Sequence, residues 1–196
     1  MSTPAASANR PGCLVILVGP AGAGKTTLAH ALERQAPAVR GFSVSHTSRP
    51  MRAGERNGVD YWFVPRGEFE RLRDADHFAE WAEVHGNLYG TSRAEIDRLH
   101  AAGQDILFDI DIQGAHNLWQ QYPAQSRLVF VLPPSWPALV QRLEARGTET
   151  EQTLCRRLRT ARRELQLLLR SPAPWHVVIN DGLTEALAAL EPLFGP

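Results

Sequence analysis

The sequence predicts an α/β fold in which helices flank a parallel sheet. Residues 14–18 form a continuous apolar run, which is typical of a strand buried on both faces. A glycine-rich turn follows, and residues 25–35 then carry Leu28 and Leu32 at helical spacing before Pro37. A strand, a glycine loop and a helix in this order open a doubly wound domain.

The rest of the chain continues this alternation after an interruption. Between about residues 40 and 90 the strand patterns are short, and a loop rich in Arg, Pro and Gly separates them, which predicts a mixed, β-rich insertion. We expect strands at 42–46, 60–64, 78–85, 105–112, 128–132 and 177–179. We expect helices at 67–74, 91–102, 114–121 and 136–145, then a long helix ending near residue 169 and a helical C-terminal segment. The apolar stripe of the long helix is Leu154, Leu158, Ala161, Leu165 and Leu168.

Composition and charge exclude several classes of protein. Lys+Arg and Asp+Glu each number 21, so the net charge is zero, whereas nucleic-acid binders usually have a basic excess. No apolar run approaches membrane-spanning length, and residues 1–11 lack the apolar region of a secretory signal. Cys13 and Cys155 match no zinc or redox spacing and suit a reducing cytosol. We therefore expect a cytoplasmic protein without nucleic-acid or membrane partners, with a flexible tail at 1–12 and one domain at 13–196.

The most specific motif lies between the first strand and the first helix. Its residues fit the pattern G-x-x-x-x-G-K-[ST] in full: Gly19, Pro20, Ala21, Gly22, Ala23, Gly24, Lys25 and Thr26. In this pattern successive backbone N–H groups and the helix N-terminus surround the phosphates of a nucleoside triphosphate. Lys25 would reach the β- and γ-phosphates, and the Thr26 hydroxyl would join a Mg²⁺ shell. The motif predicts a P-loop core that binds ATP and Mg²⁺, with Thr27 as a further contact, and leaves the acceptor open.

A second candidate anion site follows in the insertion. Arg49 and Arg52 lie three residues apart around a proline, and guanidinium groups suit bidentate phosphate contacts. Tyr61 and Tyr89 could add hydroxyl donors. Taken singly, each arginine is more simply a solvated charge and each tyrosine a half-buried core residue.

The order and number of further motifs make the chain recognisable. These motifs are Ser45-His46-Thr47-Ser48-Arg49-Pro50-x-Arg52-x-Gly54-Glu55, Gly58-Val59-Asp60-Tyr61, Glu80-Trp81-Ala82-Glu83-Val84-His85-Gly86-Asn87-x-Tyr89-Gly90-Thr91, Asp109-Ile110-Asp111-Ile112-Gln113-Gly114, Pro133-Pro134-Ser135, Arg142-Leu143-x-x-Arg146-Gly147-Thr148-Glu149-Thr150 and Val178-Ile179-Asn180-Asp181. Through them the chain resembles guanylate kinases from about residue 14 to about residue 190.

The resemblance implies a role for each matched position. It implies a GMP-binding insertion at about 43–92 and a helical lid at about 142–160. The positions that read guanine are Ser45, Glu80, Thr91 and Asp111. The positions that hold the GMP phosphate are Arg49, Arg52, Tyr61 and Tyr89, with Glu55 supporting the arginine pair. The lid arginines are Arg142, Arg146 and Arg157, which with Lys25 and Arg52 form the catalytic set, and Asn180 lies near the adenine of ATP. Ala21 and Gly182 depart from the family's usual Ser and Asp.

The chemistry of guanine agrees with the implied base site. Guanine offers N–H donors at N1 and N2 and an acceptor at O6, so two carboxylates and two hydroxyls complement it. Asp109 and Asp111 lie two apart on a predicted strand and would share a face. Either could serve Mg²⁺ instead. We assign Asp111 to guanine and Asp109 to the metal side, where it would act through a Mg²⁺-bound water.

These observations lead to one expected activity and two rivals. We expect Mg²⁺-dependent transfer of the γ-phosphoryl group of ATP to GMP, giving ADP and GDP, by a monomer or a homodimer. A related kinase of the ribose bisphosphate phosphokinase type should lack the guanine-reading acids and hydroxyls. A non-catalytic guanylate-kinase-like peptide-binding module should have a degraded phosphate loop, whereas the loop here is intact.

Overall fold

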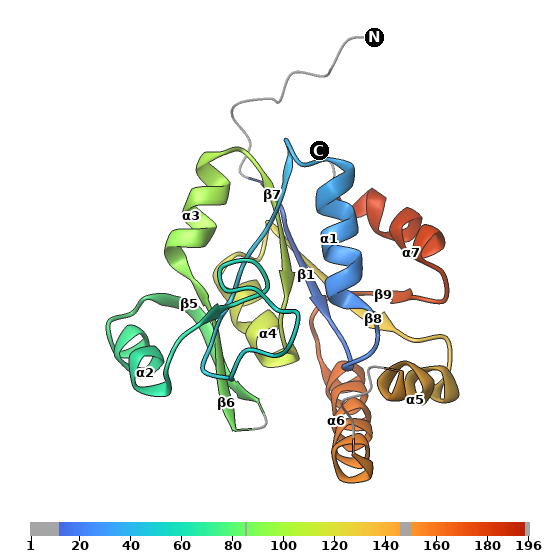
Figure 1. Ribbon diagram of the computed structural model, residues 1–196. Coiled ribbons are helices and arrows are strands. Elements are labelled where there is room, and N and C mark those ends of the chain that lie inside the picture. Colours follow the sequence, from blue (N-terminus) through green and yellow to red (C-terminus); the bar gives the residue numbers. More distant parts are fainter. Residues whose placement is uncertain (1–11, 85, 146–149, 195–196) are drawn as a thin grey trace.

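The first sheet contains five parallel strands. The computed structural model describes residues 12–84, 86–145 and 150–194 (Figure 1). Its first sheet has the order β2-β7-β1-β8-β9. The strands are β1 (Leu14–Val18), β2 (Arg40–Phe42), β7 (Asp105–Asp109), β8 (Ser126–Leu132) and β9 (Trp175–Ile179). β1 is central, and its Ile16 pairs with Phe108 on one side and Leu128 on the other.

Helices cover both faces of this sheet, which explains the continuous apolar run of β1. On one face, Val15 and Leu17 pack with α1 (Lys25–Gln35) and α7 (Leu183–Leu190). On the other, Ile16 packs with the remaining helices of the core. These are α3 (Arg93–Ala101), α4 (Ile112–Gln121) and α6 (Glu151–Arg170). The predicted α/β class is therefore confirmed.

The predicted insertion forms a second sheet beside the first one. Its order is β4-β3-β6-β5, formed by Trp62–Phe63, His46–Thr47, Asn87–Ser92 and Phe78–Val84. Helix α2 (Arg66–Asp74) covers it through Phe69, which is fully buried and stacks on Phe78 with ring centroids 4.5 Å apart. In Figure 1 this sheet and α2 stand apart from α5 (Trp136–Glu144) and the start of α6.

Three sequence-based boundaries in or next to the insertion were wrong. The predicted strand at 42–46 is two strands in different sheets, because the chain leaves the first sheet after Phe42 and enters the second at His46. The sequence did not predict β6, which pairs with β5 in a hairpin, and Thr91 lies in β6 rather than in a helix. Helix α3 begins only after Ser92, whose side chain caps it by accepting a 3.2 Å hydrogen bond from the Glu95 backbone N–H.

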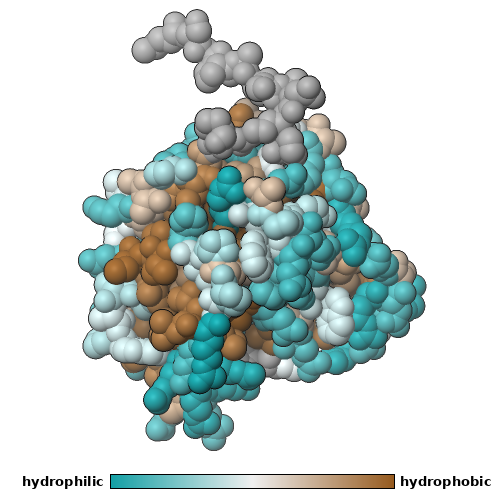
Figure 2. Space-filling model, turned by 180° about the vertical axis from the view of Figure 1, so that it is seen from behind, coloured by the Kyte–Doolittle hydropathy of each residue, from teal (hydrophilic) through white to brown (hydrophobic). Residues whose placement is uncertain are grey.

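Two strands of the core also differ from the prediction. β7 ends at Asp109, and Asp111 is the N-cap of α4, so these two residues do not share a strand face. β9 is an edge strand whose Val177 and Ile179 are 54% and 59% exposed, so it is not fully buried. Figure 2 shows apolar surface on the side of the molecule that carries β9. Only Val178 of this strand points into the core shared with α1 and α7.

Two predictions concerned the N-terminal residues and the absence of a membrane-spanning segment. Residues 1–11 of the expected tail lie outside the described residues, whereas Gly12 is buried beside Gln104. Among the helices of residues 12–84, 86–145 and 150–194, none combines the length and the apolar character needed to cross a membrane. The remaining short element is η1 (Glu191–Leu193).

Candidate active site

The phosphate loop, residues 19–26, connects the central strand β1 to the start of α1. Gly24 is the N-cap residue, and its φ of 92° is a left-handed conformation that suits glycine. No side chain of the described residues caps the first turn of α1, so its backbone N–H groups are left for an anion. The Ala23 N–H closes the loop by donating a 3.0 Å hydrogen bond to the Pro20 carbonyl.

Asn180 holds this loop from the end of β9. Its side-chain amide donates a 2.7 Å hydrogen bond to the carbonyl of Ala23 and is buried. The approach is so close that a Cβ atom on Gly24 would lie 2.3 Å from the Asn180 Nδ2 atom. The described contact of Asn180 is thus with the phosphate loop, and a contact with adenine remains a prediction.

Lys25, Thr26 and Asp109 meet where β1 and β7 end side by side. The Lys25 Nζ atom donates a 2.7 Å hydrogen bond to the Gly19 carbonyl and lies 3.6 Å from Asp109 Oδ1. The Thr26 hydroxyl donates to Asp109 Oδ2. A hydroxyl beside a carboxylate suits Mg²⁺, which takes one or two protein oxygens and completes its shell with waters and phosphates. Within the described residues no group of three or more His, Cys, Asp or Glu side chains could hold a metal by itself.

The candidate acceptor-phosphate site is built around Arg49. Both terminal nitrogens of Arg49 donate to Glu55 at 2.9 Å, and the guanidinium lies 5.3 Å from the ring centroid of Tyr61. The rings of Tyr61 and Tyr89 are 6.0 Å apart. Glu55 also accepts a 2.7 Å hydrogen bond from the backbone N–H of Arg52. Glu55 therefore orients one guanidinium and one backbone turn, while the Arg52 side chain stays exposed.

The charges of this site agree with an anion-binding function. Partial burial alone would raise the pKa of Glu55, but the hydrogen bond from Arg49 holds that pKa below its usual range. Burial raises the pKa of the Tyr61 phenol, and the charge of Asp109 acts in the same direction. Asp109 of the phosphate-loop cluster is thus one of the charges that act on Tyr61.

The candidate guanine site lies where β5 and β6 meet the start of α4. The Thr91 hydroxyl donates a 2.6 Å hydrogen bond to Glu80, and the two residues are 0% and 5% exposed. A Cβ atom on Gly114 would lie 2.3 Å from Glu80 Oε2, so glycine permits this approach. Asp111 accepts a 2.8 Å hydrogen bond from the Gly114 N–H. Ser45 is buried just before β3, the strand that pairs with β6.

Burial makes both acids of this site difficult to ionise. It raises the pKa of Glu80 to about 7, and the nearby Asp111 acts in the same direction. Burial likewise raises the pKa of Asp111. Two such carboxylates would be stabilised by a ligand that brings N–H donors to them.

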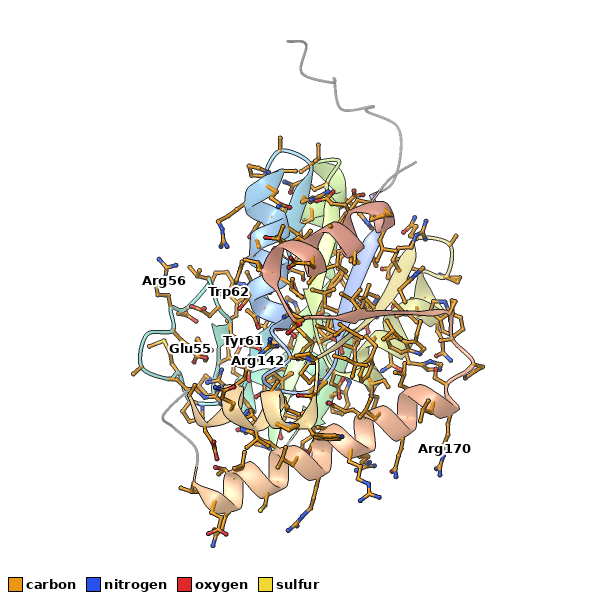
Figure 3. All side chains as sticks on the ribbon, turned by 90° about the vertical axis from the view of Figure 1, so that its right-hand side faces the viewer. Glu55, Arg56, Tyr61, Trp62, Arg142 and Arg170 are labelled. Carbon is orange, nitrogen blue, oxygen red and sulfur yellow. The ribbon has the colours of Figure 1, made fainter. Side chains whose placement is uncertain are left out.

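The residues expected in the lid are only partly described. Arg142 on α5 donates a 3.4 Å hydrogen bond to the Asp181 carbonyl, Arg157 lies on α6, and Arg146 lies outside the described residues. Figure 3 shows Glu55 and Tyr61 on the insertion, Arg142 on α5 and Arg170 at the far end of α6. Ala21 of the phosphate loop packs against a buried cluster of α5 and α6 formed by Leu139, Leu143 and Ala161. The apolar side chain of Ala21 therefore has a packing role here.

One residue near this site was missed by the sequence analysis. Glu164 on α6 lies three residues after Ala161 and four before Leu168, and both of those pack inward. An acid on the apolar side of a helix is the signal that could have identified it.

The comparison with protein families decides the class of this protein. Residues 12–195 match the family model described as Guanylate kinase. The chain belongs to the guanylate kinase family. A guanylate kinase of Anaeromyxobacter dehalogenans is 48% identical over 192 residues, covering 97% of this chain and 84% of the relative. A guanylate kinase of Oleidesulfovibrio alaskensis is 49% identical over 179 residues, covering 90% and 84%.

Solved structures give the same answer for the fold. A crystal structure of guanylate kinase from Anaplasma phagocytophilum matches with a TM-score of 0.72 and 29% identity, covering 93% of this chain and 84% of the other. A gluconokinase from Sinorhizobium meliloti, with a TM-score of 0.50 and 18% identity, shares the fold alone. The family, the nucleotide kinase fold and the enzymatic class expected for a guanylate kinase, an ATP:GMP phosphotransferase, are confirmed. Neither rival class is favoured by these relatives.

Proposed function

We propose that this protein uses Mg²⁺ to transfer the γ-phosphoryl group of ATP to GMP, with the three clusters above as donor, acceptor-phosphate and guanine sites. The observation that carries the proposal is the junction of β7 and α4. Asp109 contacts Lys25 and Thr26 of the phosphate loop, and two residues later Asp111 stands beside Glu80. A single turn thus joins the donor site to the guanine site.

The donor site would bind ATP mainly through the backbone of residues 19–26. Lys25 would exchange its hydrogen bond with the Gly19 carbonyl for the β- and γ-phosphates. Thr26 would contact Mg²⁺ directly and Asp109 through a metal-bound water, while Thr27 would add a phosphate contact. Bound there, Mg²⁺ would neutralise charge on the phosphate oxygens.

The acceptor site would hold the GMP phosphate between Arg49, Arg52 and the hydroxyls of Tyr61 and Tyr89. Phosphate monoesters are largely ionised at neutral pH, so an oxygen of GMP can attack the γ-phosphorus without a general base. The new P–O bond forms as the bond to the β,γ-bridging oxygen breaks, and ADP leaves with that electron pair. Catalysis then depends on alignment and on neutralising two anions.

The guanine site would read the base through its donors and its acceptor. Glu80 and Asp111 would accept hydrogen bonds from N1–H and N2–H₂, and Ser45 and Thr91 would donate to O6. A hydroxyl has one proton, and that of Thr91 is directed at Glu80. Binding of guanine would therefore place N1–H on Glu80 and release the Thr91 hydroxyl to turn toward O6.

The lid would complete the site when both nucleotides are bound. Arg142, Arg146 and Arg157 would stabilise charge on the transferring group and exclude water, which would otherwise accept the phosphoryl group. The packing of Ala21 against α5 and α6 gives a physical link between the loop and these helices. A monomeric or homodimeric state and a cytoplasmic location remain predictions.

The direct test is a coupled assay of ADP formation with ATP, Mg²⁺ and one acceptor at a time. GMP, AMP, UMP, CMP and ribose bisphosphate form the acceptor series. We expect GMP alone to release ADP far faster than ATP is hydrolysed without acceptor. Equal ADP release with and without GMP, or faster release with another acceptor, would overturn the proposal. Lys25→Ala, expected to lose several orders of magnitude in kcat, serves as the control for contaminating kinases.

A further inference from the structure

The strand β9 leaves one edge of the first sheet uncovered. At the other edge, all residues of β2 are buried. On β9, Val177 and Ile179 are 54% and 59% exposed, and in Figure 1 the strand lies at the margin of the sheet between α7 and α5. Figure 2 shows apolar surface on this side of the molecule. Apolar side chains gathered at an uncovered sheet edge indicate an interaction surface.

The backbone of β9 can form hydrogen bonds on its outer side. The Asn180 N–H, just after the strand, donates a 2.7 Å hydrogen bond to the Leu132 carbonyl of β8. Successive residues of a strand direct their backbone groups alternately to its two sides, so Val178 also faces β8. The N–H and C=O groups of Val177 and Ile179 therefore point away from the sheet. They form a short open edge that suits one additional strand.

The sequence of β9 contains no residue that blocks such pairing. Exposed edge strands are commonly protected by charged residues, by proline or by a bulge. Residues 175–179 contain no Lys, Arg, Asp, Glu or Pro, and their pairing with β8 has no register shift. Pro174 lies directly before the strand and limits the open edge to these residues. The edge is thus short, apolar and unprotected, as expected where a partner strand covers it.

The charges at the two ends of β9 favour a second copy of this chain as that partner. Arg170 precedes the strand, and residues 171–196 contain no Lys or Arg. Asp181 and Glu185 follow the strand, and all three side chains are exposed. None of the three forms an ion pair with another residue in the described part of the chain. When two such strands pair antiparallel, the basic end of each lies beside the acidic end of the other, whereas parallel pairing places like charges together.

We propose that two copies of this protein associate through antiparallel pairing of β9 with β9 about a two-fold axis, so that their first sheets become one continuous sheet. The Trp175 N–H already donates a 3.0 Å hydrogen bond to the Ala173 carbonyl, which leaves Val177 and Ile179 for the pairing. Val177 of one copy therefore lies opposite Ile179 of the second copy, and these side chains cover each other on one face of the joined sheet. Because the same surface is used by both copies, the association ends at a dimer.

Sedimentation velocity over a range of protein concentrations tests the association and needs no substrate. We expect the wild type to be a dimer. Val177→Lys places a charge in the pairing, and Val177→Pro removes an outward N–H without removing a hydrogen bond to β8. Each variant should raise the dissociation constant of the dimer by at least about a hundredfold. Val39 is a 40% exposed valine next to β2 at the other edge, so Val39→Lys is the matched control and should remain a dimer. Thermal unfolding checks the fold of each variant, and Val177→Lys tests the inference if the proline variant unfolds.

Cysteine cross-linking tests the orientation of the two strands. Val177→Cys and Ile179→Cys are each made in a Cys155→Ser background, which removes the exposed native thiol. An equimolar mixture of the two proteins should form an interchain disulfide on mild oxidation, because opposite Cα atoms in a hydrogen-bonded antiparallel pair lie about 5.5 Å apart. Either protein alone should not, because two copies of the same residue would lie diagonally, about 7–8 Å or more apart.

Three results would overturn the inference. The first is a wild type that stays monomeric at every concentration. The second is a dimer that persists in both Val177→Lys and Val177→Pro, because it must then form through another surface. The third is a mixture of the cysteine variants that cross-links no faster than either variant alone, which would exclude the antiparallel pairing.

Discussion

Thr91 donates its hydroxyl proton to Glu80 across the β5–β6 hairpin at 2.6 Å, in a site from which water is nearly excluded. The two residues lie opposite each other on neighbouring strands, because Glu80 and Thr91 are register partners in the β5–β6 hairpin. A ligand must therefore displace this hydrogen bond and replace it with better ones. That requirement makes base selectivity the most informative property of the enzyme.

Truncation of Glu80 should reduce selectivity for guanine. A site built on buried hydrogen bonds can reject the wrong base by roughly 10⁴-fold, because its polar groups are left unpaired. In Glu80→Ala, kcat/KM for GMP should fall by at least about a hundredfold, while that for AMP should change little. The measurement is kcat/KM for GMP, IMP and AMP. Glu83→Ala, on the same strand but exposed, is the matched control. An equal loss for all three bases would show that Glu80 serves the fold.

Binding of GMP should weaken as the pH falls below about 7. Burial raises the pKa of Glu80 to about 7, and the guanine N1–H requires the ionised carboxylate. Between pH 8 and pH 6 the ionised fraction of such a group falls about tenfold, so Kd should rise by about the same factor. The phosphate of GMP titrates near pH 6 as well, so Glu80→Gln is the reference. Calorimetric titration of both proteins should show a weaker pH dependence in the variant, and identical slopes would contradict the assignment.

The same residue should limit the stability of the protein without substrate. The folded pKa of Glu80, about 7, lies above the ordinary value of 4.5 for a glutamate. Glu80 therefore contributes stability that is fully present below about pH 4.5 and is lost as the pH rises through about 7. The difference corresponds to about 3 kcal/mol. Glu80→Gln should raise Tm at pH 8 and have little effect near pH 5, as measured by calorimetry. An equal Tm difference at both pH values would exclude a contribution from ionisation.

Asn180→Ala should loosen the phosphate loop. The variant loses the hydrogen bond to Ala23 and leaves a buried carbonyl without its donor, which should raise Kd for ATP by about tenfold. If Asn180 acts through the loop, Kd for inorganic tripolyphosphate should rise by a similar factor. A loss confined to ATP would instead indicate a contact with adenine. His176 is exposed on β9, the strand that ends just before Asn180, so His176→Ala is the control and should bind both ligands normally.

Glu55→Ala should impair the acceptor-phosphate site. Arg49 would lose both of its carboxylate hydrogen bonds, and the Arg52 turn would lose its acceptor. We expect KM for GMP to rise about tenfold or more, with KM for ATP nearly unchanged. Steady-state kinetics against each substrate gives both values. Glu68→Ala removes an acid from α2 of the same insertion as a control. An increase in KM for both nucleotides would show a general effect on the fold.

The sequence predicts best those parts of the molecule that depend on local patterns. The β1 run, the glycine loop and the start of α1 are contiguous, so their periodicity and turn chemistry suffice. The insertion was predicted less well, because β3 and β4 are two residues each and owe their existence to partners elsewhere in the chain. No local pattern shows that the chain changes sheets after Phe42.

Some candidate site residues could be identified from the sequence, whereas the contacts of others could be seen only in the structure. The roles proposed for Lys25, Arg49 and Glu80 came from ordered motifs, and in the structure each of them pairs with a residue of its own cluster, namely Asp109, Glu55 and Thr91. The structure adds what motifs do not contain: Asp111 caps a helix, Asn180 holds the loop, and Glu164 faces inward. Each depends on burial or on a contact between distant segments, which a single sequence does not display.

The junction of β7 and α4 limits the distance between Asp109 and Asp111. Ile110 alone separates the acid of the donor site from the acid of the guanine site, and two successive Cα–Cα steps span at most about 7 Å. In the proposed complex, covalent geometry would therefore limit the distance between the guanine and the ATP phosphates, even if the insertion and the lid move. Inserting one residue at this point would displace the base from the phosphate loop by up to about 3.5 Å, a larger error than in-line transfer tolerates. In the proposed complex, the spacing between Asp109 and Asp111 would have to match the length of the acceptor nucleotide.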